Sequence, residues 1–206
     1  MTKKEKLQKL KDSMQRDMAL PLRKGATQLV FGEGDPETEI MFIGEGPGYW
    51  EDQKGSPFVG NAGAFLNQLL ITAGLTREKV FITNVVHHRP PQNRDPEPSE
   101  IAAYQPYLNE MIDIIDPKII VTLGRFSMGK FLPNAKITSV HGKKFDVNWK
   151  GKNLVAVPMY HPAAGLRSVD VKQQTLDDFK KLPGILEETR NKDNNKKEEV
   201  KQMTLV

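Results

Sequence analysis

The sequence predicts an α/β fold, a three-layer αβα sandwich around a central, mostly parallel four-stranded sheet. Short apolar stretches alternate with longer amphipathic ones, and a loop rich in glycine, proline or polar residues follows each apolar stretch. Strands and helices that alternate in this way form a parallel sheet covered on both faces. The four expected strands are residues 40–43, 80–85, 119–123 and 154–158.

Three helices are expected in the first part of the chain. Residues 3–18 place leucine and methionine at spacings of three and four, which is the period of an amphipathic helix. Residues 62–73 show the same pattern. A third helix is expected over Ser99–Ile115 with Ser99 as its N-cap, and Pro106 should kink it or shift its start.

The second part of the chain predicts a short helix near residues 126–131, an antiparallel excursion over 141–149 and a helix over 175–188. The last residues are rich in charge and asparagine, a composition typical of disorder. We therefore predict a single domain over residues 1–188 and a charged, disordered tail over 189–206.

The composition excludes several classes of function. The 206 residues include no cysteine, which excludes disulfides, thiolate nucleophiles and cysteine-bound metal centres. No apolar run is long enough to cross a membrane, and no signal-peptide core is present, so we expect a cytoplasmic protein. The net charge of +4 comes from a basic N-terminus, so it is weak evidence for nucleic-acid binding.

The loop after the first strand, Gly44–Gly48, combines glycines with an acid. Glycines let a backbone approach a ligand closely. A dinucleotide site is excluded because the G-x-G-x-x-G spacing is absent and Pro47 interrupts the loop. A plain strand-ending turn would explain the glycines, but it would not require the carboxylate of Glu45.

Asn84 and Phe58 each allow two interpretations. Asn84 ends the second strand, where asparagine is often a turn former, but its amide could also read a nucleobase because it both donates and accepts hydrogen bonds. Phe58 lies in a glycine-flanked loop, where it could be a core residue or a platform on which a base stacks.

Histidines follow two of the strands. His161 follows the fourth strand and precedes Arg167, which favours a functional role at the ligand-binding edge of the sheet. His87 and His88 suggest a metal at first sight. Adjacent residues of an extended segment point in different directions, and no third ligand is evident, so we expect no metal site.

Three sequence blocks together resemble the family-4 uracil-DNA glycosylases, in matching order and over about residues 20–182. The first block is Gly44–Gly48 with Glu51-Asp52 and Gly55–Gly60. The second is Ile82–Val86 with Arg89-Pro90-Pro91 and Asn93–Pro96, and the third is Tyr160–Ala164 with Leu166-Arg167.

The resemblance implies an enzyme that flips uracil out of DNA and hydrolyses its N-glycosidic bond, leaving an abasic site for base-excision repair. The expected partner is uracil-containing DNA, single- or double-stranded, and the expected state is a monomer without a cofactor. Glu45 would stabilise the cationic sugar and orient the water, and His161 would donate a hydrogen bond to uracil O2.

The resemblance also implies which residues bind the substrate. Phe58 would stack on uracil, Asn84 would pair with its O4 and N3–H edge, and Glu51 would lie near C5 and help to exclude thymine. Gly46 would also contact the base. The expected contacts with the DNA strand are Arg89, Leu166 and Arg167, with Leu166 as a wedge.

One departure from the family is large. The four cysteines that usually hold a four-iron cluster match Asp17, Leu20, His88 and Tyr104, none of which is a thiolate, so we expect no conventional cluster. We expect Leu20 and Tyr104 to pack together in its place.

Two alternatives stay open: the same scaffold could act on another deaminated or modified base, or it could be a non-catalytic DNA-binding protein. Retention of Glu45, Phe58, Asn84 and His161 argues against the second.

Overall fold

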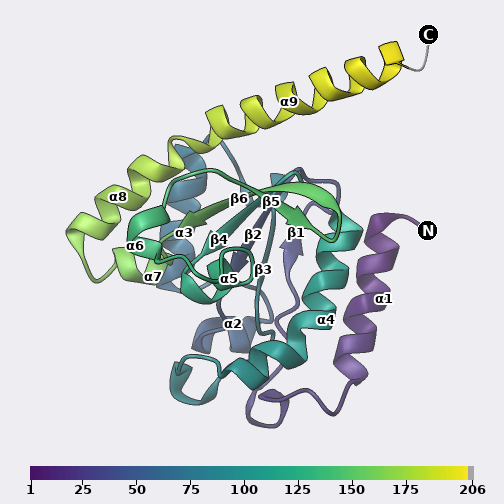
Figure 1. The fold of residues 1–206 in the computed structure, drawn as a ribbon. Helices are drawn as coiled ribbons and strands as arrows, with labels where there is room; N and C mark the ends of the chain where they lie inside the picture. The colour runs from purple at the N-terminus through teal and green to yellow at the C-terminus, as the bar shows by residue number, and fades with distance from the viewer. Residues whose placement is uncertain (204–206) are drawn as a thin grey trace.

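The strands form one sheet in the order β1-β3-β2-β4-β6-β5 (Figure 1). The computed structural model describes the backbone of residues 1–203 and the side chains of residues 1–192. The four central strands run parallel, and β1 and β5 join the edges in antiparallel pairs. The α/β class is confirmed. The expected count of four strands was wrong, because the sheet also contains the two edge strands β1 and β5. The bounds are β1 Glu33–Gly34, β2 Ile40–Gly44, β3 Phe81–Asn84, β4 Ile119–Leu123, β5 Phe145–Trp149 and β6 Lys152–Met159.

Of the two edge strands, the sequence contained no sign of β1 but did predict the segment that forms β5. β1 has only two residues, which is too short for any hydrophobic pattern to predict. β5 is the antiparallel excursion expected before the fourth central strand, and it pairs with β6 through a tight turn.

The central strands are apolar along their whole length because both faces of the sheet are covered. Successive residues of a strand point to opposite faces. In β2, Ile40 and Phe42 join one cluster of buried side chains, whereas Met41 and Ile43 join the other. The sheet therefore separates two hydrophobic cores.

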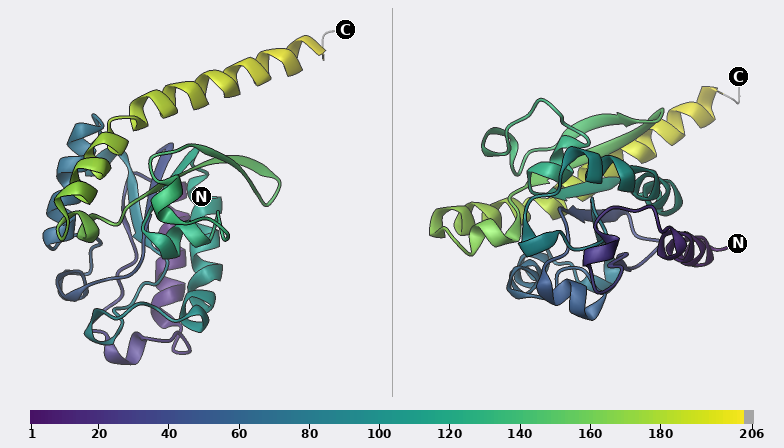
Figure 2. Two further views of the ribbon diagram at one scale, coloured as in Figure 1. Left: turned by 60° about the vertical axis from the view of Figure 1, so that its left-hand side comes forward. Right: turned by 90° about the horizontal axis from the view of Figure 1, so that it is seen from below.

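Helices α1 and α4 lie side by side and cover one face, while α3 and α8 cover the other (Figures 1 and 2). Shorter helices lie in the loops between these layers. The bounds are α1 Lys3–Arg16, α2 Tyr49–Lys54, α3 Asn61–Thr72, α4 Pro98–Ile115, α5 Arg125–Gly129, α6 Ile137–Val140, α7 Pro162–Gly165 and α8 Val169–Phe179.

Helix α4 begins earlier than expected. Its N-cap is Glu97 and not Ser99, and the Glu97 N–H donates to the Glu100 carboxylate at 2.7 Å. Pro98 occupies the first helical position, where its missing N–H costs nothing. Pro106 lies inside a helix that continues to residue 115.

Helix α9 runs over Leu182–Met203 and leads away from the body of the molecule (Figure 1). It therefore continues through residues 189–203, so the structure is helical where the composition predicted disorder. The reason is that this stretch is rich in lysine, glutamate and glutamine, which are good helix formers. The domain boundary at residue 188 stays a prediction, and the end of the expected tail, 204–206, lies outside the described residues.

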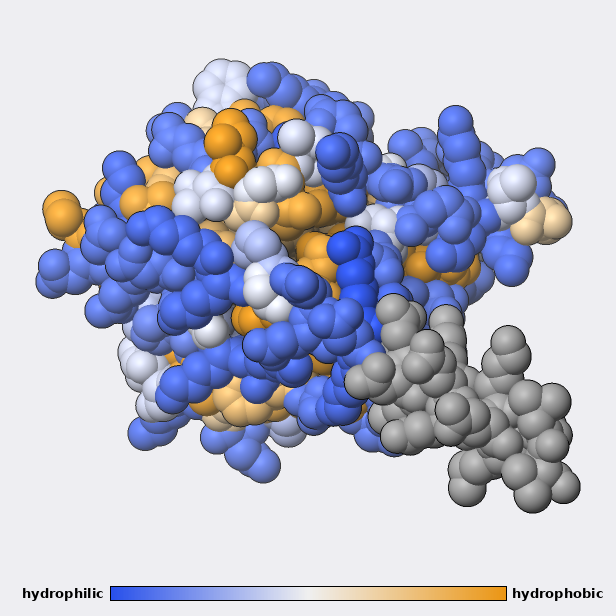
Figure 3. Space-filling view, turned by 90° about the horizontal axis from the view of Figure 1, so that it is seen from above, coloured by the Kyte–Doolittle hydropathy of each residue, from blue (hydrophilic) through white to orange (hydrophobic). Residues whose placement is uncertain are grey.

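The face seen from above, near the start of α9, is covered mostly by hydrophilic side chains with hydrophobic ones between them (Figure 3). Such a mixture is ordinary for the surface of a globular protein. No described helix combines the length and the apolar character that a membrane span requires.

The four positions that match the cluster cysteines do not fit an iron–sulfur cluster. Leu20 offers no donor atom, and the Tyr104 hydroxyl donates to the Pro21 carbonyl. That hydroxyl therefore accepts from His88 Nδ1, at 2.7 Å. Leu20 and Tyr104 belong to the same buried cluster, as expected, but hydrogen bonds also tie the N-terminal segment to α4.

Tyr104→Phe should lower the free energy of unfolding by about 1–3 kcal/mol, because it leaves the buried His88 Nδ1–H and the part-buried Pro21 carbonyl without their partner. Tyr107→Phe is the matched control. The Tyr107 hydroxyl donates to Asp17 in a part-buried position, where water can replace it, so the loss should be smaller. Urea unfolding of both variants measures the difference, and equal losses would contradict the role given to Tyr104.

Candidate active site

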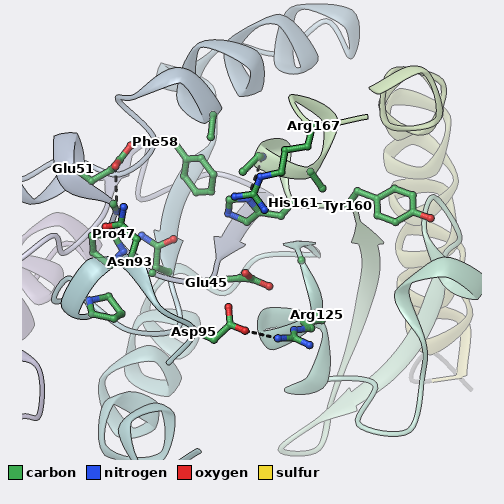
Figure 4. A pocket seen from close by; sticks show the side chains of 18 of the residues that line it. Glu45, Pro47, Glu51, Phe58, Asn93, Asp95, Arg125, Tyr160, His161 and Arg167 are labelled. Atoms are coloured by element: carbon green, nitrogen blue, oxygen red, sulfur yellow. Dashed lines mark hydrogen bonds and ion pairs between the residues drawn. The ribbon is translucent and has the colours of Figure 1, made fainter. Parts of the chain in front are cut away.

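A cavity of about 470 Å³ opens at the carboxyl ends of the four parallel strands (Figure 4). The pairing of Gly44 with Asn84 and of Leu123 with Met159 brings these strand ends together. Each of the four following loops contributes to the lining, as the sequence predicted. The lining includes Glu45, Gly46, Gly48, Glu51, Phe58, Asn84, Asn93, Asp95, Gly124, Arg125, Tyr160, His161 and Arg167.

Glu45 follows β2 and reaches the start of α5. Its Oε1 accepts a hydrogen bond from the Phe126 N–H at 3.2 Å. Gly124 permits this approach: its φ is +102°, and a Cβ there would lie 2.3 Å from Oε1. Burial raises the pKa of Glu45 above its ordinary value; the Phe126 N–H opposes this shift, and the nearby Asp95 charge adds to it.

Asp95 and Arg125 form an ion pair beside Glu45 (Figure 4). They come from the loop before α4 and from the first residue of α5. Both side chains are about two thirds exposed, at 65% and 63%. Water and salt therefore screen the pair, which acts on Glu45 as a modest local field.

Phe58 is buried and has a left-handed backbone, with φ +52°. A bulky residue rarely adopts this conformation unless its surroundings enforce it. Arg77 does so by donating to the carbonyl oxygens of Pro57 at 2.6 Å and Phe58 at 3.1 Å, while it forms an ion pair with Glu33 of β1. The Phe58 ring consequently lies 5.6 Å from the His161 ring, centroid to centroid.

Asn84 lines the cavity although it is only 2% exposed. Its Oδ1 has no hydrogen-bond partner among the described residues. An unsatisfied buried acceptor is costly, so this oxygen is free to accept a hydrogen bond from a donor that enters the cavity. Gly44 makes room for it, since a Cβ there would lie 2.4 Å from Asn84 Oδ1 and 2.6 Å from the Phe58 ring.

His161 precedes α7, and its Nδ1 accepts a hydrogen bond from the Ala163 N–H at 3.2 Å. A backbone N–H can only donate, so in the neutral imidazole the proton is on Nε2. Burial, and then the Arg167 charge, lower the pKa of His161 to about 4. At neutral pH the residue is therefore an uncharged donor through Nε2.

Glu51 lies at the edge of the cavity, but its carboxylate is already occupied. One oxygen accepts from the N–H groups of Val59 and Gly60, each at 2.9 Å, and the other accepts from the Gly48 N–H at 3.1 Å. Glu51 therefore fixes the loop of Gly48 against the loop of Phe58.

The residues expected to bind DNA are not all in the cavity. Arg167 lines it, whereas Leu166 lies outside the lining with its side chain 49% exposed. Arg89 also lies outside: its guanidinium is 5.2 Å from the centre of the Tyr49 ring, and its Nε donates to Asn93 Oδ1 at 2.7 Å.

Sequence reasoning assigned no role to several residues that build the site. Asp95 and Arg125 lie in two of the loops considered, and their opposite charges at the edge of the sheet were the available signal. Arg77 gave no signal, because its hydrogen-bond partners are ten or more residues away along the chain.

No group of three or more histidine, aspartate or glutamate side chains is arranged to hold a metal ion within the described part of the chain. His87 and His88 are buried. The Nδ1 of His87 donates to the Val30 carbonyl at 3.1 Å, and that of His88 is bonded to Tyr104.

Comparison with known proteins agrees with this geometry. Residues 31–181 match the uracil DNA glycosylase superfamily. A type-4 uracil-DNA glycosylase of Sulfurisphaera tokodaii is 47% identical over 184 residues, which cover 86% of this chain and 84% of that protein. The type-4 uracil-DNA glycosylase of Thermotoga maritima is 40% identical, covering 90% of this chain and 97% of that protein. The type-4 uracil-DNA glycosylase of Archaeoglobus fulgidus is 43% identical over 78% of this chain and 83% of that protein. With its sequence blocks, its cavity and these relatives in agreement, the chain belongs to the uracil DNA glycosylase superfamily.

Proposed function

We propose that this protein is a DNA glycosylase that hydrolyses the N-glycosidic bond of uracil in DNA and leaves an abasic site for base-excision repair. The observation that carries the proposal is that an acid, an aromatic ring, an unpaired amide and a neutral imidazole line one cavity: Glu45, Phe58, Asn84 and His161. The relatives named uracil-DNA glycosylases support the same conclusion.

Base recognition depends on Phe58 and Asn84. An everted uracil would stack on the Phe58 ring and present its N3–H to Asn84 Oδ1 and its O4 to the amide N–H₂. Cytosine offers the opposite pattern at these two positions, so it would leave the buried amide unpaired. Glu51 would help to exclude thymine by holding the walls of the cavity in place rather than by contacting the base.

The chemistry depends on His161 and Glu45. Breaking the glycosidic bond places negative charge on uracil O2 and positive charge on the sugar. The Nε2–H of neutral His161 would donate to O2, where the charge develops only near the transition state. Glu45 would stabilise the sugar cation and orient the attacking water.

Arg167, beside the cavity, would contact a phosphate of the everted nucleotide, while the exposed Leu166 would fill the gap left in the base stack. Arg89 would contact the strand farther along. The proposed reaction requires no metal or organic cofactor, because the residues around the cavity supply all of these roles. In this proposal the protein is also a cytoplasmic monomer.

Cleavage of oligonucleotides tests the proposal directly. Single- and double-stranded substrates with one uracil, one hypoxanthine or one modified base should release uracil only. Release of another base in preference to uracil would support the same scaffold with a different substrate. Binding without any release would instead indicate a non-catalytic DNA-binding protein.

His161→Ala should slow single-turnover excision by about 10²–10³-fold, because it removes a donor that acts on the developing oxyanion. Affinity for uracil-containing DNA should change little. His161→Asn is the folding control, since its side-chain oxygen can still cap the Ala163 N–H while its amide is too short to reach O2. Equal losses of rate and of affinity would contradict the catalytic role.

Asn84→Asp should weaken discrimination between uracil and cytosine, because a carboxylate cannot donate to O4 of uracil while its protonated form can pair with cytosine. The measurement is the ratio of single-turnover rates on matched oligonucleotides that contain uracil or cytosine. An unchanged ratio would sink the pairing argument.

The rate of excision should fall as the pH decreases through the raised pKa of Glu45, because protonation removes the negative charge that faces the sugar. Asp95→Asn removes a charge that raises this pKa, so it should move the acidic limb to lower pH. Arg125→Gln removes a charge that lowers the pKa and should move the limb to higher pH. Profiles of kcat/KM against pH check both, and shifts in one common direction would be inconsistent with control of Glu45 by this ion pair.

A further inference from the structure

Two large aromatic side chains are exposed next to the cavity. Tyr49 and Trp50 are 48% and 56% exposed and form the first turn of α2. Their rings meet edge to face, with centroids 5.1 Å apart. The preceding residue, Gly48, lines the cavity, so this pair lies at its rim. The reaction proposed above uses neither residue.

Both rings are held in place by neighbours. The guanidinium of Arg89 lies over Tyr49, and Arg89 is itself fixed by its hydrogen bond to Asn93, a cavity residue. Trp50 packs over Gly60, where a Cβ would lie 3.3 Å from the indole Cδ1. Exposed rings that are already ordered lose little conformational entropy when a ligand stacks on them.

We propose that Tyr49 and Trp50 form a stacking platform for an unpaired DNA base adjacent to the everted uracil, and that this platform favours single-stranded substrate. The inference rests on the proposed function for the position of the uracil. A DNA strand continues on both sides of an everted nucleotide, so its neighbouring nucleotides must cross the rim of the cavity.

The chemistry of the rim suits a nucleotide better than another apolar partner. Indole and phenol rings stack on any base, and Arg89 places a positive charge where the backbone phosphates pass. In duplex DNA the neighbouring base is already stacked and paired. Only an unpaired base can occupy the platform without first breaking those contacts, which is why single strands should gain more from it.

Tryptophan fluorescence tests the platform without requiring catalysis. The chain has two tryptophans, Trp50 and Trp149. Subtracting the spectrum of Trp50→Phe from that of the wild type isolates the emission of Trp50. Single-stranded oligothymidylate without uracil should quench this emission, whereas a base-free abasic oligonucleotide of equal length should not. Equal quenching by both, or none by either, would overturn the proposal.

Kinetics test the strand preference. Trp50→Ala should lower kcat/KM for single-stranded uracil DNA roughly tenfold through KM, and for duplex DNA by less, because one lost base–aromatic stack weakens binding by about that factor. Tyr49→Ala should act in the same direction. Ile71→Ala on α3 removes an apolar side chain that is even more exposed, at 72%, but lies on another helix; it is the control and should change neither value.

The outcomes separate this inference from the proposed function. If the wild type releases uracil but Trp50→Ala is unaffected on single strands, the platform is wrong and the glycosylase stands. If no base is released by the wild type while oligothymidylate still quenches Trp50, the glycosylase proposal fails, and the platform is a single-strand binding site only. If wild-type protein dimerises, Trp50→Ala is monomeric and DNA does not quench, the surface binds a second copy instead.

Discussion

Phe58 and Asn84 can lie beside the end of β2 because residue 44 has no side chain. A single carbon atom there would overlap both the amide oxygen of Asn84 and the edge of the Phe58 ring. The aromatic ring comes from one loop and the amide from a strand end, and their common approach to Gly44 creates a space bounded by a ring and an amide. The distance between Phe58 and His161 depends on this packing, and so does the shape of the cavity.

Burial shifts the pKa of two groups in the site, and only the shift of His161 favours the charge state that its proposed role needs. Burial disfavours the charged form of any group. It lowers the pKa of His161 and so keeps the imidazole neutral, while the Ala163 N–H fixes the proton on Nε2. The same effect raises the pKa of Glu45, and the N–H group at the start of α5 opposes it. One cavity thus holds a neutral hydrogen-bond donor, His161, and a carboxyl group, Glu45, whose pKa values are set by different neighbours.

Hydrogen bonds and apolar packing join the N-terminal segment to α4 at residues whose side chains do not fit an iron–sulfur cluster. The N-terminal segment is tied to α4 by the Tyr104 hydroxyl, which joins the Pro21 carbonyl to His88. Leu20 adds apolar contact from the same segment. A buried hydroxyl with both of its partners satisfied, packed among apolar side chains, is a stable arrangement. Pro21, His88 and Tyr104 do not line the cavity, and none of the proposed chemistry passes through them.

The αβα class, the four central strands and the four loops that supply the cavity can be predicted from the sequence alone, because apolar runs and glycine-rich loops are local signals. The sequence also indicated Glu45, Phe58, Asn84 and His161, since each lies in such a loop. Tertiary structure decided what the sequence could not: that Arg77 enforces the backbone of Phe58, that Asp95 and Arg125 flank Glu45, and that backbone N–H groups occupy the carboxylate of Glu51. The same holds for β1, whose two residues are a strand only because β3 pairs with them. Apart from the local contact of Glu51 with Gly48, these contacts join residues that are eight or more positions apart along the chain. No local pattern predicts them, because they form only once folding brings the loops to one edge of the sheet.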